Sequence, residues 1–386
     1  MKNRQDRFAV FIIVCLFMIT IAGSRPLIPL YARDLGASHG EIGVIVALFS
    51  FLPLFFSIKA GKIIDGIGVR SPLILGILFG SLSMIILAIF NNLMGIYISQ
   101  IFSGLAQLIF VLAIQAYAGQ FSKSKLREYF ISVFSIAVAA GSFVGPLISG
   151  GLSEVLSNTY SFFILGIIVL LAVPLSFLLN KLKKKKIEPV EQGEKEANSF
   201  KLLRIEDLRK AVIVSSLVLL AKDTYIAFFP LLAAEKGVST LVISVIISLN
   251  AAAGILIRSI LPWMVRRLKR NVIITISILV AGLIYILNPF VDSVIGFSIL
   301  AFVLGFCSGI GQPLSIFTTI NSLPHDRVAE GLGLRLMFNK LTQILAPLSL
   351  GAVSSIAGMS GVFYVCGAII LAGSLNSNSL FFTKNK

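Results

Sequence analysis

Charged and amide side chains interrupt the long apolar stretches of this sequence, and they are the groups that could bind a solute or carry an ion. Arg25, Lys222 and Asp223 lie well inside such stretches. An ionised side chain at the centre of a membrane helix costs about 2.5–3.5 kcal/mol, so each needs a partner or a water-filled cavity. Further candidates for a solute cavity or for ion coupling are Gln107, Gln115, Asn250, Arg258, Gln312 and Asn339.

Several of these residues belong to polar stripes at helical spacing, which places the members of each stripe on one face of a helix. The stripes are Gln100, Gly104, Gln107, Val111 and Gln115; Asn250, Gly254 and Arg258; Ser308, Gln312, Ser315 and Thr319; and Arg335, Asn339 and Gln343. Such a face must turn towards protein or water rather than lipid. Hydrogen bonding between helices would explain each stripe alone, so a cavity and a structural role both stay open.

The embedded charges are unbalanced, because five cations stand against one clearly embedded acid, Asp223. The cations are Arg25, Lys222, Arg258, Arg335 and Lys340. A cavity lined by them would be positive, which favours an anionic or zwitterionic solute over a lipophilic cation. Arg258 and Arg335 are expected near the cytoplasmic ends of their helices, where a long side chain can instead reach the lipid head groups.

Side chains that support catalysis or metal binding do not form clusters in the sequence. The three cysteines fall in apolar stretches without the spacing of metal ligands, and the two histidines fall in expected loops: Cys15, Cys307, Cys366, His39 and His325. A membrane-embedded metalloenzyme would need a cluster of His, Cys or carboxylate groups. We therefore expect no enzyme, no metal site and no cofactor.

Long apolar stretches recur along nearly the whole chain and would position these residues. The hydrophobic fraction is 57%, only 13% of residues are charged, and the mean hydropathy is +0.96. No water-soluble domain is that apolar, and a helix of about 20 residues crosses the hydrocarbon core. The sequence predicts an all-α membrane protein with twelve transmembrane helices near 8–31, 42–64, 73–91, 94–118, 129–152, 160–180, 211–232, 243–265, 272–291, 295–320, 331–356 and 361–381.

A hydrophilic segment, 181–210, divides the predicted helices into two sets of six, 1–180 and 211–386. Its last part, Phe200 to Lys210, alternates apolar and charged residues and is expected to form a helix along the membrane surface. Most of the 33 Lys and Arg residues fall on the same side of the membrane as the N-terminus, and only Arg33 and Lys236 fall in the loops on the opposite side. This distribution predicts cytoplasmic termini and explains the net charge of +16 without a nucleic-acid partner.

An internal repeat relates the two sets of helices. A shift of 201 residues aligns Pro29-Leu30 with Pro230-Leu231, Gly36 with Gly237, Ser38 with Ser239, Gly104 with Gly305, and Pro146 with Pro347. Because each set has an even number of helices, the two copies share their orientation in the membrane. We expect two six-helix bundles related by pseudo-two-fold symmetry, with a solute site near the midplane.

The loop after the second predicted helix contains Gly61, Asp65, Gly68 and Arg70 in the pattern G-x-x-x-D-x-x-G-x-R. At this location the pattern resembles a motif of the major facilitator superfamily. The resemblance implies the major facilitator fold and a conformational latch at the cytoplasmic ends of neighbouring helices. In the second set, Pro262, Arg266 and Asn271 stand at the positions of Gly61, Asp65 and Arg70, so this pattern is lost there.

Two further regions bear on the kind of transporter. The fifth predicted helix contains Gly141, Gly145, Pro146 and Gly150, a helix-packing pattern similar to the glycine-rich motif of the family's antiporter branch, although Ser149 departs from it. In the fourth, many proton-coupled members carry an Arg four residues before a Gly, whereas this chain has Gln100 before Gly104. Since Gln cannot shift a neighbouring carboxyl pKa by charge, proton coupling stays open.

Together these features predict a secondary transporter that moves a small solute by alternating access, with export of a drug or metabolite favoured. Uptake or uniport of a small organic anion is the alternative, and a channel or membrane-embedded enzyme is disfavoured. The family lines its cavity with the first, fourth, seventh and tenth helices, which gives weight to Gln107, Gln115 and Gln312. The expected partners are the solute, a coupling proton or sodium ion, and the lipid bilayer. We expect the protein to be a monomer in the plasma membrane.

Overall fold

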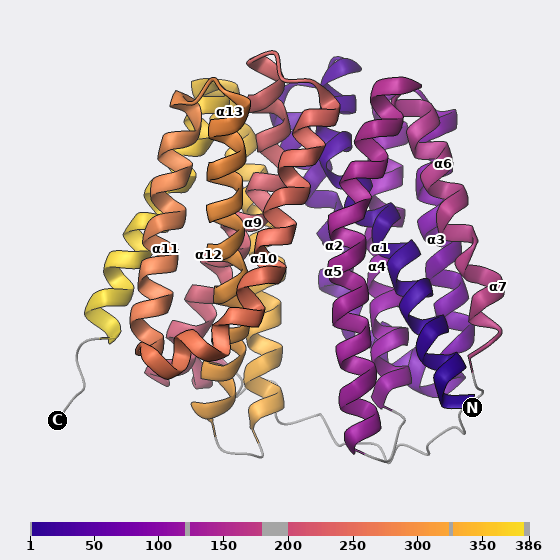
Figure 1. Ribbon diagram of the computed structural model, residues 1–386, viewed down its shortest axis with the longest axis horizontal. Coiled ribbons are helices and arrows are strands. Elements are labelled where there is room, and N and C mark those ends of the chain that lie inside the picture. The colour runs from indigo at the N-terminus through magenta and orange to yellow at the C-terminus, as the bar shows by residue number, and fades with distance from the viewer. Residues whose placement is uncertain (1, 120–123, 180–199, 324–326, 382–386) are drawn as a thin grey trace. The chain divides into compact units, whose positions relative to one another are not determined.

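The computed structural model describes residues 2–119, 124–179, 200–323 and 327–381. Within these ranges the chain is helical, and no β-strand occurs (Figure 1). The N-terminal half contains α1 (Lys2–Asp34), α2 (His39–Ile67), α3 (Arg70–Ile89), α4 (Leu93–Gly119), α5 (Ser124–Val155), α6 (Asn158–Leu170) and α7 (Ala172–Ser176). Only Leu171 separates α6 from α7, and the two form one apolar segment of 19 residues, Asn158–Ser176.

The C-terminal half has a similar series of membrane helices, with two 3-10 helices added and the last two membrane segments joined in one helix. It contains the 3-10 helix η1 (Phe200–Arg204), α9 (Glu206–Glu235), α10 (Thr240–Arg267), α11 (Arg270–Leu287), the 3-10 helix η2 (Asn288–Phe290), α12 (Val294–Asn321) and α13 (Val328–Phe381). Helix α13 breaks at Gly358, whose φ of 68° and ψ of −177° are not helical. The break falls between the predicted eleventh and twelfth membrane helices, so α13 contributes both of them.

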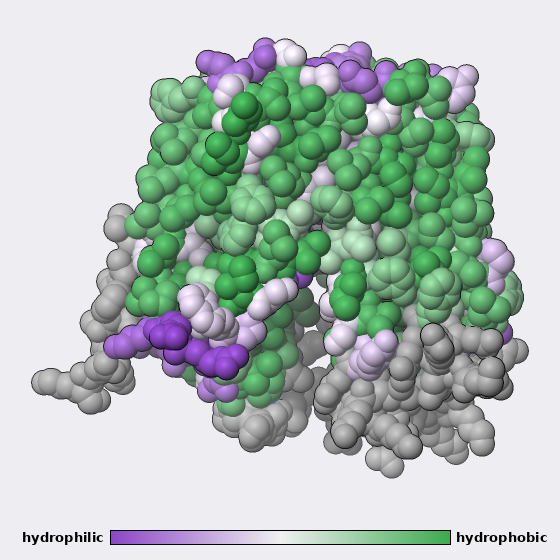
Figure 2. Space-filling model, in the orientation of Figure 1, coloured by the Kyte–Doolittle hydropathy of each residue, from purple (hydrophilic) through white to green (hydrophobic). Residues whose placement is uncertain are grey.

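Eleven helical segments among the described residues are long and apolar enough to cross a membrane. The last of them, Glu330–Ser374, has 45 residues. A straight helix of that length would measure about 68 Å, more than twice the thickness of the hydrocarbon core of about 30 Å. Because Gly358 divides this segment in two, the described residues supply twelve apolar helical segments, the number that the sequence predicts. Figure 2 shows hydrophobic side chains along the middle of the helices and hydrophilic ones near their ends.

The described residues divide into two compact units. The N-terminal unit is Met1–Glu188 with Gly237–Ser248, and the C-terminal unit is Pro189–Lys236 with Leu249–Lys386. The first turns of α10 therefore pack with the N-terminal unit. Most of the predicted linker lies outside the described residues. The segment where a surface helix is expected, Phe200 to Lys210, contains η1 and the start of α9, and its Leu202 and Leu208 are buried in an apolar cluster with Leu334.

The repeat seen in the sequence is present in the backbone geometry. Gly36 and Gly237 both adopt a positive φ, 85° and 78°, in the turns that follow α1 and α9. Such angles are strained for any residue with a Cβ. In the N-terminal half, Ser38 and Glu41 form a reciprocal cap at the start of α2. In the C-terminal half, the Ser239 hydroxyl accepts a hydrogen bond from the Val242 N–H at the start of α10.

Candidate functional site

A chain of polar side chains runs along α13 inside the C-terminal unit and links it to α9 and α12. Arg335, Asn339 and Gln343 recur every four residues, so successive side chains lie about 6 Å apart along one helix face. Each is hydrogen-bonded to a polar side chain of another helix. We call this arrangement the polar ladder, with members Arg335, Asn339 and Gln343 of α13, Gln312 and Ser315 of α12, and Ser215 and Asp223 of α9.

The first rung joins Arg335 to α12. Arg335 is only 4% exposed, and its Nε donates to the Ser315 hydroxyl over 2.8 Å. Its Nη2 donates to the side-chain carbonyl of Gln312. The Gln312 amide then donates to the Ser215 carbonyl of α9 over 3.2 Å, and this bond holds three helices together. The predicted reach of Arg335 to the head groups is therefore wrong, because two acceptors on α12 draw the side chain into the unit.

The second rung is neutral, and the third carries charge. In the second, the Ser215 hydroxyl donates to the Asn339 side chain over 2.8 Å, and both residues are buried. In the third, the Gln343 amide donates to the Asp223 carboxylate over 2.8 Å. Lys340 donates to the carbonyl of the same Gln343 side chain over 2.8 Å. Gln343 thus stands between an amine and a carboxylate, and its amide dipole is favourable to both.

The other predicted site residues of this half lie elsewhere in the unit. Asn250 is buried and donates to the Ala301 carbonyl over 2.7 Å, so it links α10 to α12. Lys222 and Arg258 are exposed on their helices. Lys222 and its helix neighbour Asp223 point about 100° apart around the axis of α9, which explains why one is exposed and the other buried.

The predicted site residues of the N-terminal unit do not form a comparable network. The Arg25 guanidinium lies 5.0 Å from the centre of the Phe49 ring. Gln107 is half-buried and Gln115 exposed, and neither makes a hydrogen bond to a described residue. Gln100 is buried, and its amide nitrogen has no acceptor among the described residues.

The predicted latch lies where α2 meets α3. Gly68 ends α2 with a φ of 90°, which requires a residue without a Cβ, while Gly61 has open space around its α-carbon. The Arg70 guanidinium donates to the Phe177 carbonyl over 3.1 Å and also to the Leu179 carbonyl. These carbonyls lie at the C-terminal end of the sixth membrane segment, where a nearby cation stabilises the partial negative charge of the helix end. The Asp65 side chain lies outside the described residues.

The glycines of the fifth membrane helix lie against α1. A Cβ added to Gly141 would be 2.5 Å from the Cβ of Met18, and one added to Gly145 would be 2.6 Å from the Ile19 carbonyl oxygen. Neither position has room for a larger residue. Within the same unit, a Cβ on Gly150 would be 2.2 Å from the Ser244 hydroxyl of α10.

The two remaining residues of this motif region also act between helices. Ser149, which departs from the family pattern, donates to the Gly23 carbonyl of α1 over 2.8 Å. Pro146 lies inside α5 without ending the helix. The motif therefore joins α5 to α1 by close backbone contact and by a side-chain hydrogen bond.

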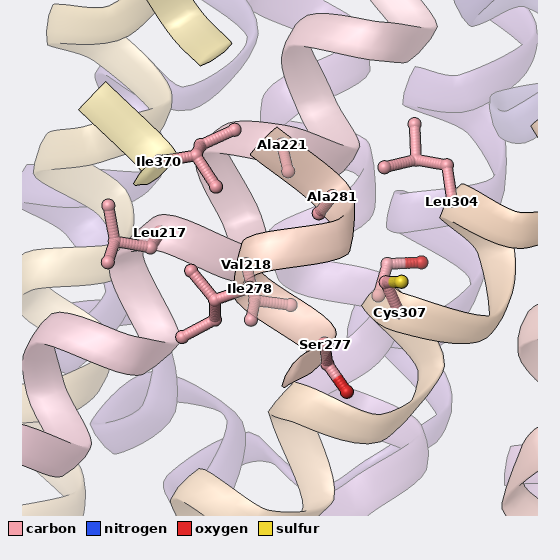
Figure 3. A pocket seen from close by; sticks show the side chains of 10 residues that line it. Leu217, Val218, Ala221, Ser277, Ile278, Ala281, Leu304, Cys307 and Ile370 are labelled. Carbon is pink, nitrogen blue, oxygen red and sulfur yellow. The ribbon is translucent and has the colours of Figure 1, made fainter. Parts of the chain in front are cut away.

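A separate pocket lies in the C-terminal unit among α9, α11, α12 and α13. Figure 3 shows its mainly apolar lining, which includes Val218 and Ala281. The lining residues with polar side-chain atoms are Ser277, Cys307 and Ser308. Ladder residues do not line it. In the described part of the chain, no group of three or more His, Cys, Asp or Glu side chains could hold a metal ion.

Some ladder residues were absent from the residues selected as a cavity or coupling site in the sequence. Arg335, Ser315 and Gln343 stand in polar stripes at helical spacing, which was the available signal. Ser215 is one of two adjacent serines in an apolar stretch of α9, and nothing in its local sequence distinguishes it from Ser216. Its role depends on the helix that packs opposite, which spacing along one helix does not reveal.

The known proteins that resemble this chain are membrane transporters. Quinolone resistance protein NorA of Staphylococcus aureus is 22% identical over 96% of the chain and 95% of that protein. The staphylopine export protein of the same species is 22% identical over 94% and 92%. The nucleoside transporter NupG matches the fold with a TM-score of 0.83 at 15% identity, over 99% of this chain and all of that one. The model of the Major Facilitator Superfamily matches residues 10–295, and the chain belongs to this family of secondary transporters.

Proposed function

We propose that the protein exports a small organic solute from the cytoplasm by alternating access, driven by an ion gradient. The polar ladder is the observation that carries this proposal. It concentrates hydrogen-bonding groups inside one unit of a membrane protein, where each needs a polar partner or a polar solute. The direction of transport is supported by the names of NorA and the staphylopine export protein, and by the glycines and proline of α5.

The proposed orientation places both termini in the cytoplasm of a cell whose plasma membrane holds the protein as a monomer. The distribution of Lys and Arg supports it. The short turn between α10 and α11 would lie on the cytoplasmic side, and it exposes Arg266, Arg267, Lys269 and Arg270.

Asp223 is the proposed carrier of the coupling ion. Among the described residues of the membrane segments, it is the acid that lies farthest from a helix end. It is 7% exposed, and a carboxylate at this depth can alternate between a bound proton or sodium ion and an ionised form. Gln343 donates to this carboxylate and Lys340 donates to Gln343, so both side chains stand beside the proposed ion site.

The remaining candidate residues have separate proposed roles. Gln312 and Asn339 would contact the solute, and Arg25, Gln107 and Gln115 would face it from the N-terminal unit. Gly61, Asp65, Gly68 and Arg70 would act as the latch, which changes the populations of the two access states and leaves solute contacts unchanged. The bond from Arg70 to the end of the sixth membrane segment supports a role in holding helix ends together.

Everted membrane vesicles test the direction and the driving force. Everted vesicles are prepared from cells that express the protein, and a pH gradient, acidic inside, is imposed across their membrane. A quinolone or a cytoplasmic metabolite extract is then added outside the vesicles. We expect gradient-dependent accumulation of at least one solute, and counterflow of that solute without a gradient. Vesicles that lack the protein provide the background. Accumulation only in right-side-out vesicles would reverse the direction and favour uptake of an organic anion, and linear flux without counterflow would indicate a channel.

A further inference from the structure

The guanidinium group of Arg335 has donors for which the described residues supply no acceptor. An arginine carries five N–H donors, and the structure gives Arg335 two acceptors, the Ser315 hydroxyl and the Gln312 carbonyl. Its third nitrogen, Nη1, makes no hydrogen bond to a described residue. Both acceptors are neutral, so a full positive charge is buried at a position that is 4% exposed.

No acid of the described chain balances this charge within ion-pair distance. Glu330, the acid of α13 nearest to Arg335 in sequence, and Glu206 at the start of α9 are both engaged with other cations. Glu330 accepts from Arg327 over 2.9 Å, and Glu206 lies 2.7 Å from Lys210. Asp223 belongs to the third rung, two helical turns along α13 from Arg335.

A buried cation with neutral partners is unfavourable unless an anion completes it. Removing a charge from water carries a penalty of several kcal/mol, which neutral hydrogen bonds offset only in part. A carboxylate is the natural partner, because its two oxygens match the planar fork of a guanidinium. If Arg335 served only to join α12 to α13, a neutral side chain could make the same two bonds without that penalty.

We propose that Arg335 binds the carboxylate of the transported solute, which is therefore an organic acid with one negative charge near this site. The inference rests on the proposed function and names the solute class. A single cation balances a single charge, and the next rung along α13 offers the neutral Ser215 and Asn339. The Asp223 carboxylate beyond that rung would repel a second negative charge, which disfavours phosphate esters and dicarboxylates.

Thermal stability of the purified full chain in detergent tests this assignment without any transport step. The probes are matched pairs, each an acid and its amide: benzoate with benzamide, nicotinate with nicotinamide, and indole-3-acetate with its amide. Sodium chloride and sodium sulfate at equal ionic strength test inorganic anions. We expect at least one acid to raise the midpoint of unfolding more than its amide and more than the salts, because a ligand that binds the native state stabilises it.

Three variants separate binding from folding. Arg335→Gln retains a hydrogen-bonding side chain but loses the charge, so the preference for acid over amide should fall about tenfold or more in apparent affinity. Arg335→Lys keeps the charge without the planar fork and should retain part of the preference. Arg267→Gln removes the same charge from an exposed position at the end of α10 and should behave as the unaltered protein.

The outcomes distinguish this inference from the proposed function. If no acid stabilises the unaltered protein more than its amide, or if chloride or sulfate does so equally, the assignment of an organic carboxylate is wrong. It is also wrong if a folded Arg335→Gln or Arg335→Lys protein keeps the full preference. Should Arg335→Gln fail to fold, the Lys variant decides. Export in vesicles together with any of these results would leave the proposed function intact and remove only the solute class.

Discussion

The two halves of the chain share their helix contacts but differ in the chemistry of their interiors. In the N-terminal unit, a Cβ on Gly104 would be 2.1 Å from the Phe49 carbonyl oxygen. In the C-terminal unit, a Cβ on Gly305 would be 2.2 Å from the Asn250 carbonyl oxygen. Both residues of the second pair follow those of the first by 201 positions. The repeat therefore preserves the point at which two helices touch, including the residue whose backbone carbonyl lies against the glycine.

Most positions of the polar ladder carry apolar residues in the other copy, and the exception is Gln343, whose counterpart is Ser142. The same shift relates Ser215, Gln312, Ser315, Arg335 and Asn339 to Val14, Val111, Ile114, Phe134 and Val138. These five apolar residues belong to, or pack against, the main apolar core of the N-terminal unit. In that core the rings of Phe17 and Phe110 stack with their centres 3.7 Å apart.

This difference indicates a division of roles between two copies of one scaffold. Glycine contacts set the helix arrangement and are needed in both copies, so they persist. Polar groups in a membrane interior are unfavourable unless they have partners or a function, so one copy retains them and the other packs with apolar side chains. We therefore expect substitutions in the ladder to affect transport, and substitutions at the paired glycines to affect folding equally in both units.

The largest effect is expected for the substitution Asp223→Asn. The residue that corresponds to Asp223 in the N-terminal unit is Ala22. Asn can keep the hydrogen bond with Gln343 but cannot ionise, so ion coupling should be lost. Gradient-driven accumulation in everted vesicles should fall about 100-fold, while counterflow, which needs no net ion movement, should persist. Asp34→Asn is the matched control, because Asp34 is exposed at the end of α1 beside Arg33. Accumulation within twofold of the unaltered protein would rule out Asp223 as the ion carrier.

The paired glycines should give the next largest effect, and an equal one in the two units. Gly104→Ala and Gly305→Ala each force two backbones apart and should destabilise the protein by about 1–3 kcal/mol. Gly61→Ala and Gly333→Ala serve as controls, one in each unit, because nothing lies within 4 Å of a Cβ at either position. Thermal unfolding in detergent measures all four. A neutral result for one of the paired glycines would show that the repeat does not preserve their contact.

Helical spacing predicted much of the ladder but not its partners. The stripe of Arg335, Asn339 and Gln343 and the stripe containing Gln312 and Ser315 follow from a period of 3.6 residues, which needs no knowledge of the fold. Which stripe faces which depends on helix packing. The stripe that begins at Asn250 has the same spacing, yet Asn250 bonds a backbone carbonyl of α12.

The direction of a long side chain was equally inaccessible to sequence reasoning. Arg335 is near the start of α13, and an arginine there can extend to the head groups or turn inwards. The acceptors on Ser315 and Gln312, 20 and 23 residues away in the sequence, determine its direction. The membrane helices and the repeat, in contrast, follow from hydropathy and from a constant shift, which are local properties of the chain.

The latch provides a third comparison, since its pattern occurs only in the first copy. The substitution Arg70→Gln removes the hydrogen bonds to the Phe177 and Leu179 carbonyls. In the second copy, the residue that corresponds to Arg70 is the uncharged Asn271. We expect the rate of transport to fall about fivefold with solute affinity unchanged, because a latch alters the populations of the access states. Asp65→Asn should act in the same way.

Transport rates and equilibrium binding, measured on the same preparations, check the latch. Asn271→Gln is the control in the second copy and should leave both quantities unchanged. A loss of binding in a folded Asp65→Asn or Arg70→Gln protein would mean that these residues contact solute.

The smallest effect is expected for Ser215→Val, which gives the C-terminal unit the residue found at the corresponding position of the N-terminal unit, Val14. The hydroxyl donates to Asn339, and its loss should change the free energy of unfolding by no more than about 1 kcal/mol, a typical net value for one hydrogen bond. If the second rung contacts solute, affinity should still fall severalfold, because Asn339 loses its partner where the solute binds. Ser103→Ala is the matched change in the N-terminal unit, where Ser103 donates to the Ser83 hydroxyl over 2.9 Å. That substitution should reduce stability by a similar amount without changing affinity. Equal responses of affinity to the two substitutions would contradict the assignment of solute binding to one copy of the repeat.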